Sequence, residues 1–146
     1  MSQTLATVIT GASSGIGEAL ARQLAAKEKQ ALVLVARRQE KLENLAAELR
    51  TKHGVRVEVI GLDLEQVGAA TQLVAAVDAL GLSIDMLINN AGVSQRALVK
   101  DTILSVDRAL LEVDYFGPVA LTKTLLPYML ARNSGRLVAV SSIAGL

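Results

Sequence analysis

Thr10-Gly11-Ala12-Ser13-Ser14-Gly15-Ile16-Gly17 is the stretch that decides the fold of this 146-residue chain. It follows a short, β-branched apolar run at residues 5–9, which indicates a buried strand. It opens a segment in which Ile16, Leu20 and Leu24 recur every four residues, as on one face of a helix. A strand, a glycine-rich turn and a helix in this order predict a βα unit that holds a phosphate group.

The three glycines of this stretch have separate roles in such a unit. Gly11 allows a tight turn, Gly15 lets a pyrophosphate approach the backbone, and Gly17 lets the helix pack closely on the strand. The N–H groups of the first helical turn then face the anion, helped by the helix macrodipole. An ordinary βα turn that contains glycines is the alternative, and the strand before it and the helix after it favour the phosphate site.

Length and composition predict one α/β domain, residues 1–146. Apolar residues make up 51% and aromatic residues 2%, which is typical of an aliphatic parallel sheet covered by helices on both faces. A net charge of +1 gives no reason to expect nucleic acid or a membrane as a partner. Cysteine is absent and histidine occurs once, so no metal site is expected. No leader or membrane-spanning run is visible, which predicts a cytoplasmic protein.

Short apolar runs that alternate with helical patterns, with no linker between them, predict the strands of one sheet. Because strand and helix alternate, the strands are expected to be parallel and joined by right-handed crossovers. Ligands of such sheets bind beyond the carboxyl ends of the strands. The five predicted strands are residues 5–9, 31–36, 55–60, 86–88 and 136–142.

Two of the intervening segments have a clear helical period. Residues 39–52 carry apolar side chains at positions i, i+3, i+4 and i+7, which indicates an amphipathic helix. Residues 65–80 predict a further helix with Val67, Val74 and Val77 facing inward.

The end of the second predicted strand indicates the cofactor. Dinucleotide sites usually carry Asp or Glu there, which binds the ribose 2′-hydroxyl of NAD. This chain has Arg37-Arg38 instead, and a guanidinium suits a 2′-phosphate through bidentate, charge-assisted bonds. We therefore predict NADP(H), with Arg37 as the primary contact and Arg38 as the secondary one. Two solvated loop arginines are the alternative.

The glycine spacing G-x-x-x-G-x-G, preceded by Thr10, differs from the more common G-x-G-x-x-G fingerprint. It resembles the signature of the short-chain dehydrogenase/reductase family, in its classical branch. Asn89-Asn90-Ala91-Gly92 matches the N-N-A-G motif of that family, whose backbone lines the cofactor cleft, although the four residues are also a good turn sequence. The resemblance implies a Rossmann-like, doubly wound parallel sheet. It also implies an oxidoreductase that moves a hydride between NADP(H) and a carbonyl/alcohol substrate.

Further residues acquire roles through this resemblance. Asp63, which precedes Leu64, resembles the adenine-binding Asp of the family and is equally placed to be the N-cap of the following helix. Ser141-Ser142 resembles the catalytic serine segment, with Ser142 bonding the substrate oxygen, although serine after a strand is common in any turn. The predicted cofactor-binding residues are Thr10, Gly11, Ser13, Ser14, Gly15, Ile16, Gly17, Arg37, Arg38, Asp63, Leu64, Asn90, Ala91 and Gly92.

One departure from the family lies in a long helical pattern at residues 105–132. The chain has Asp114-Tyr115-Phe116-Gly117 where the family has a catalytic asparagine that helps to hold a proton-relay water. An ionised aspartate accepts hydrogen bonds but does not donate them, and it adds a negative charge. Asp114 is therefore a tolerated substitute, a cause of impaired activity or an ordinary polar helix residue. Gly117-Pro118 in the same pattern indicates a kink or a break.

A second departure concerns the Tyr-x-x-x-Lys pair of the family, its acid/base group and the lysine that activates it. Neither tyrosine of the chain fits this motif, because the residue four positions after Tyr115 is Val119 and the residue four positions after Tyr128 is Arg132. We therefore expect the N-terminal part of the family domain, truncated before its last strands, to bind cofactor without turnover. A non-catalytic NADP(H)-binding, sensing or scaffold protein is the alternative, and the glycine spacing disfavours a sugar-nucleotide epimerase. Family members are usually homo-oligomers, and the sequence does not identify the substrate.

Overall fold

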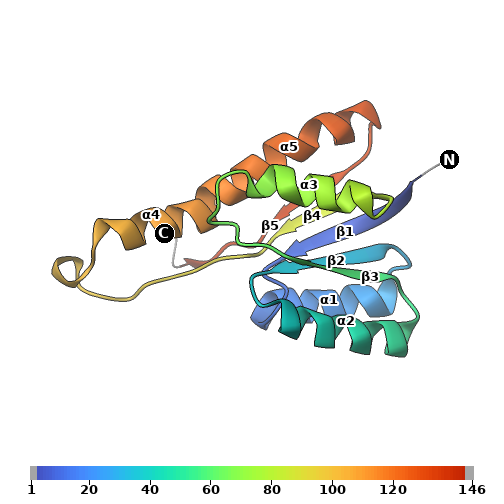
Figure 1. Ribbon diagram of the computed structural model, residues 1–146, viewed down its shortest axis with the longest axis horizontal. Coiled ribbons are helices and arrows are strands. Elements are labelled where there is room, and N and C mark those ends of the chain that lie inside the picture. The colour runs from blue at the N-terminus through green and yellow to red at the C-terminus, as the bar shows by residue number, and fades with distance from the viewer. Residues whose placement is uncertain (1–2, 144–146) are drawn as a thin grey trace.

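Five parallel strands form one sheet in the order β3-β2-β1-β4-β5 in this computed structural model, which describes residues 3–143 (Figure 1). The chain runs from β1 outward to β3 and then passes back over β1 to β4, so the strand order reverses beside β1. The prediction of a Rossmann-like, doubly wound sheet is confirmed. The strands are β1 (Thr4–Thr10), β2 (Ala31–Ala36), β3 (Val57–Gly61), β4 (Leu82–Asn89) and β5 (Arg136–Ala139).

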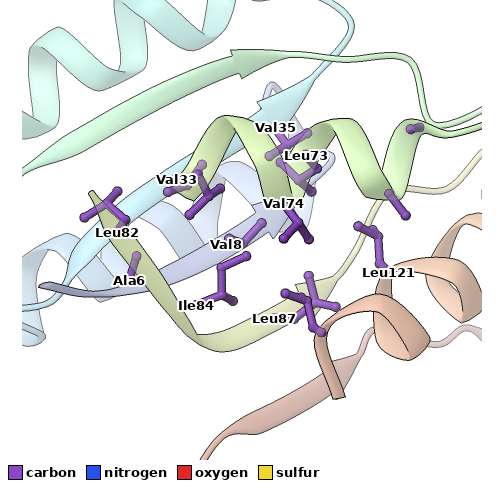
Figure 2. Close-up of a cluster of buried hydrophobic side chains, with 14 of the residues drawn as sticks. Ala6, Val8, Val33, Val35, Leu73, Val74, Leu82, Ile84, Leu87 and Leu121 are labelled. Atoms are coloured by element: carbon purple, nitrogen blue, oxygen red, sulfur yellow. The ribbon is translucent and has the colours of Figure 1, made fainter. Parts of the chain in front are cut away.

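Helices cover both faces of the sheet (Figure 1). One face carries α1 (Gly15–Lys27) and α2 (Gln39–His53), and the other carries α3 (Ala69–Ala79) and α5 (Gly117–Ala131). Each layer is filled by aliphatic side chains, and burial of each large one contributes about 1.5–3 kcal/mol. Figure 2 shows the layer under α3 and α5, which includes Val8, Val33, Leu73, Val74, Leu87 and Leu121. Among the described residues, no helix has the length and hydropathy needed to cross a membrane.

The buried face of α1 differs from the predicted one. Gly17, Ala21 and Ala25 are the buried residues of this helix, whereas Ile16 is 60% exposed. The period of four was correct, but the predicted phase was wrong by one residue. The reason is that small side chains bring the helix close to the sheet, which leaves the larger side chain of Leu20 only partly buried at the flank of the contact.

The helix predicted at residues 65–80 begins later than expected. α3 starts at Ala69, directly after Gly68, whose φ of 83° is incompatible with a continuing right-handed helix. Val67 therefore lies in the preceding turn and is 97% exposed, so its predicted inward position was wrong. Val74 and Val77 are buried as predicted.

The long helical pattern is confirmed in its extent but not in its regularity. α4 (Leu104–Leu111), a π-helical turn (Glu112–Phe116) and α5 follow one another without an intervening loop. Gly117-Pro118 therefore neither ends the helix nor leaves it regular. Pro118 has no backbone N–H to bond the carbonyl four residues earlier, and the π-helical turn directly before α5 is where the regular helical pattern is interrupted.

The last strand is shorter than predicted. β5 ends at Ala139, and one more ladder bond follows from Val140 N to Asn89 O at 2.9 Å. Ser141 and Ser142 continue in irregular, exposed backbone at the carboxyl end of the sheet. β4 is longer than predicted because Leu82–Asp85, in which apolar and polar residues alternate, also belong to the strand.

Candidate functional site

An open cavity of about 610 Å³ lies at the carboxyl end of the sheet, where the strand order reverses. Segments that follow four different strands contribute to its wall, as expected for a doubly wound sheet. Most of the predicted cofactor-binding residues line it, namely Gly11, Ser13, Ser14, Ile16, Arg37, Arg38, Asp63, Leu64, Asn90, Ala91 and Gly92.

Thr10 lies behind this wall and holds two of its segments together. Its side chain is buried, and its Oγ1 accepts hydrogen bonds from the backbone N–H groups of Asn90 and Ala91, both at 3.0 Å. The same hydroxyl donates to Ile88 O at 3.3 Å. Thr10 therefore ties the end of β1 to the end of β4 at the base of the cavity.

The glycine-rich turn packs directly on the segment after β4. The Asn90 amide Nδ2 donates to Thr10 O at 3.1 Å and to Gly11 O at 3.3 Å. A Cβ on Gly17 would overlap with Gly11 O and with the Asn90 amide, so only glycine fits at the start of α1. Gly15 has a φ of +57°, and a Cβ there would meet nothing within 4 Å. Gly15 therefore leaves open space in front of the helix.

The N-terminus of α1 is available to an anion. Ser14, the N-cap residue, makes no side-chain capping hydrogen bond, so its hydroxyl does not cover the N–H groups of the first turn. The Ser13 and Ser14 hydroxyls instead accept hydrogen bonds from Arg38, each at 3.3 Å. Arg37 lines the same wall. Two arginines and two serine hydroxyls thus border the same cavity as the N-terminus of α1, and together they are the donor set that a phosphorylated ligand needs.

Asp63 does not cap α3. Its Oδ1 accepts the Glu65 N–H at 3.0 Å, and its backbone O accepts the Gln66 N–H at 3.1 Å. These bonds close the turn after β3, whereas the N-cap of α3 is Gly68. The predicted role as a helix N-cap was therefore wrong. The extra turn, which ends at a glycine with positive φ, separates Asp63 from the helix.

Asp114 joins the π-helical turn to the segment after β4. Its Oδ1 accepts the Val93 N–H at 2.8 Å, and a Cβ on Gly92 would lie 3.4 Å from the same oxygen. This bond needs an acceptor only, so the side-chain oxygen of an asparagine would serve equally. The neighbouring Val113 is buried and lines the cavity. The structure thus gives Asp114 a contact that does not depend on an amide N–H.

Ser142 and Asp114 are not among the residues that line the cavity. Ser142 is exposed and lies three residues beyond the end of β5. The last part of the predicted serine segment, Ala144-Gly145, lies outside the described residues. Within residues 3–143, no cluster of His, Asp or Glu side chains has the arrangement of a metal site.

Sequence reasoning missed the apolar part of the cavity wall. The pattern placed three of these side chains in strands or helices and two in loops, and it gave no indication that they face a ligand. The only available signal was their position next to residues already assigned to the site. The missed residues are Val35, Ala36, Leu62, Val93 and Val113.

Comparisons with known proteins agree with this architecture. The family model described as short chain dehydrogenase matches residues 5–146. Dehydrogenase/reductase SDR family member 7B of Mus musculus is 43% identical over 141 residues, which are 94% of this chain and 43% of the relative. The chain therefore spans less than half the length of this curated relative.

Solved structures with the same fold include two that were determined with NADPH. L-sorbose reductase from Gluconobacter frateurii, complexed with NADPH and L-sorbose, has a TM-score of 0.88 and 33% identity, over 100% of this chain and 55% of that one. A short-chain dehydrogenase from Sphingobium yanoikuyae in complex with NADPH has a TM-score of 0.87 and 32% identity, over 96% of this chain and 54% of that one.

Proposed function

The chain belongs to the short-chain dehydrogenase/reductase family, and from this premise we propose that its cavity binds NADP(H). We further propose that the whole protein moves a hydride between the nicotinamide and a carbonyl/alcohol pair of a small-molecule substrate. The observation that carries the proposal is the group of donors that borders the cavity. Arg37 and Arg38 stand where a carboxylate would select NAD, and Arg38 already lies against Ser13 and Ser14.

The wall of the cavity matches the parts of a dinucleotide. The arginines and serines suit the 2′-phosphate, and the N-terminus of α1 with the open space at Gly15 suits the pyrophosphate. Asp63 and Leu64 would hold the adenine, while the backbone of residues 90–92 would line the cleft on the side of the redox chemistry. Once bound, the cofactor supplies the hydride, and these residues supply binding and orientation.

We assign Ser142 to the substrate oxygen and Asp114 to the position of the family's catalytic asparagine. The 146 residues contain no Tyr-x-x-x-Lys pair to transfer a proton. We therefore propose that this chain, as given, binds NADP(H) without turnover. Purified chain mixed with NADPH and a panel of ketones and aldehydes should give no loss of absorbance at the NADPH band beyond the rate without protein. A loss of NADPH absorbance that increases with the concentration of the chain would refute this part of the proposal.

Calorimetric titration with NADP⁺ and NAD⁺ tests the choice of cofactor. A bond between charged groups is worth about 1.5–3 kcal/mol, so Arg37→Ala is expected to weaken NADP⁺ binding by about 10- to 100-fold. NAD⁺ binding should change little. Arg38→Ala should weaken NADP⁺ binding less, because Arg38 is the secondary contact. Lys52→Ala, which removes an exposed cation at the far end of α2, is the matched control. Equal affinity of the unmodified chain for the two cofactors would refute the assignment of the arginines.

A further inference from the structure

Asp85 is an acidic residue in the middle of a buried strand. It is 7% exposed, and its neighbours Ile84 and Met86 belong to the aliphatic core. The strand pairing is irregular at this point, because Ala6 pairs with Ile84 while Thr7 pairs with Met86. Asp85 is therefore one extra residue in β4, a β-bulge. Such bulges re-aim the side chains that follow them and are uncommon between parallel strands.

The bulge changes which face of the sheet the end of β4 presents. Ile84 and Leu87 share the layer under α3 and α5, although they are three positions apart, an odd number, along a strand in which side chains alternate. Met86 and Ile88 lie in the opposite layer. A slip by one residue would exchange the two faces. The bulge therefore determines toward which face of the sheet the later residues of β4 point. With this register, the Asn90 side chain reaches the glycine-rich turn, to which it is hydrogen-bonded.

A hydrogen-bond network holds the Asp85 carboxylate. Oδ2 accepts from Arg136 at 3.3 Å and from Gln30 at 3.4 Å, and Oδ1 accepts from the Ser134 hydroxyl at 3.3 Å. Gln30 in turn accepts from the Thr7 hydroxyl of β1 at 3.3 Å. A buried carboxylate without such donors would be strongly unfavourable. The donors come from the turn before β2, from the turn after α5 and from the first residue of β5.

We propose that Asp85 is a positioning residue for the candidate site. Asp85 stabilises the bulge, which determines the register of β4 and thereby the orientation of Asn90. Asp85 also holds Arg136 at the start of β5, the strand that leads to Ser142. Asn90 is five positions beyond Asp85, about 16 Å along an extended chain, so Asp85 acts on the site only through the two strands. The role of Ser142 in this inference rests on the proposed function, whereas the position of β5 does not.

Amide hydrogen exchange, measured residue by residue, tests the inference. Asp85→Leu keeps the branched shape of the side chain but is larger and accepts no hydrogen bond, whereas Asp85→Asn keeps the size of the side chain and one acceptor oxygen. We expect Asp85→Leu to speed exchange at Asn90 and Val140 by at least about tenfold relative to Val33 of β2, because opening would be local to β4 and β5. Asp85→Asn should restore most of the protection.

A matched control is available at the opposite edge of the sheet. Glu58→Leu removes the ion pair of Glu58 with Arg56, which is 2.7 Å long. Because Glu58 is the pairing partner of Val33, the control is read at the other two amides, and exchange at Asn90 and Val140 should stay unchanged. The chain has no cysteine, so Ser142→Cys adds a second local readout, the rate of reaction with a thiol reagent. When Ser142→Cys is combined with Asp85→Leu, the rate of reaction with the thiol reagent should change by at least about threefold in either direction. When it is combined with Glu58→Leu, this rate should stay constant.

Equal acceleration of all three amides by Asp85→Leu, or none, would overturn the inference. If that variant does not fold, Arg136→Leu decides instead, because the Arg136 side chain is 54% exposed and its loss leaves the core intact. It should speed exchange selectively at Val140, and uniform exchange would count against the inference. Titration of the unmodified chain with NADPH separates the two proposals. If NADPH does not bind, the proposed function is refuted, whereas the positioning role of Asp85 is still decided by the exchange result.

Discussion

Replacement of Thr10 by valine removes a hydroxyl and keeps the shape of the side chain. Thr10 is 1% exposed, and its Oγ1 accepts two backbone N–H groups, those of Asn90 and Ala91, each at 3.0 Å. The same group donates to Ile88 O at 3.3 Å. Valine leaves both N–H groups and one carbonyl without this partner, at the junction of β1 with β4. We therefore expect Thr10→Val to destabilise the fold and to weaken cofactor binding together.

The size of the effect follows from the burial of these groups. A buried donor left without an acceptor costs about 1–3 kcal/mol, and the two N–H groups are only partly buried, so the low end applies to each. The total is about 2–4 kcal/mol, a large share of the about 5–15 kcal/mol that stabilises a typical domain. For a chain of this length, the unfolding midpoint should fall by about 5–15 °C.

Far-UV circular dichroism is the suitable assay, because the chain has no tryptophan to report unfolding by fluorescence. Urea and thermal unfolding of Thr10→Val and Thr10→Ser would be compared with those of the parent chain. Serine keeps the hydroxyl and loses a methyl group, which costs about 1 kcal/mol. Thr10→Ser should therefore be the more stable of the two variants. The opposite order, or a valine variant as stable as the parent chain, would show that packing and not hydrogen bonding joins β1 to β4.

Substitutions at three other positions give separate tests. Gly17→Ala places a Cβ on a backbone carbonyl oxygen of the turn and should abolish NADPH binding in calorimetry while lowering the urea midpoint. Asp114→Asn keeps the acceptor for the Val93 N–H and should leave stability within about 0.5 kcal/mol, whereas Asp114→Leu should lose about 1 kcal/mol, and equal urea midpoints would contradict this account. The hydrogen bond from Arg22, 2.6 Å long, lowers the pKa of the Glu48 carboxyl. Its contribution to stability is therefore present above the unfolded-state pKa and is lost as pH falls through the folded-state pKa. The difference in urea midpoint between the parent chain and Glu48→Gln should accordingly shrink from pH 7 to pH 3, and a constant difference would exclude the ion pair as its cause.

The parts of the fold that the sequence predicts well are those specified by local chemistry. The strand at residues 31–36, buried except for its last residue, is a continuous apolar run and was predicted with its observed bounds. The helix predicted at residues 39–52 extends to His53, and it ends at Gly54 with a left-handed backbone. In both cases the local residue types leave one favourable conformation, so no distant contact is needed to specify it.

The parts that were wrong depend on distant contacts. α1 packs through its small residues because the sheet allows close approach, and a pattern of large apolar residues cannot indicate this. The π-helical turn at Glu112–Phe116 accompanies a hydrogen bond that Asp114 accepts from the N–H of Val93, 21 residues earlier in the chain. Asp85 appeared to lie outside any strand because an acidic residue interrupts the apolar run, yet its donors lie up to 55 residues away. The local conformational preferences of the residues carry no information about these distant contacts.

The glycine-rich turn and the Asn-Asn-Ala-Gly segment are best regarded as one structural unit. The Asn90 amide bonds to the carbonyl oxygens of Thr10 and Gly11, and the missing side chain of Gly17 makes the room that this amide occupies. An alanine at residue 17 would displace the amide, and a residue without an amide at position 90 would leave two carbonyls of the turn without their donor. Neither motif can therefore keep its geometry without the other. Because of this mutual dependence, a glycine pattern that is weak evidence alone becomes strong evidence for a cofactor site when the Asn-Asn-Ala-Gly segment follows about 80 positions further along the chain.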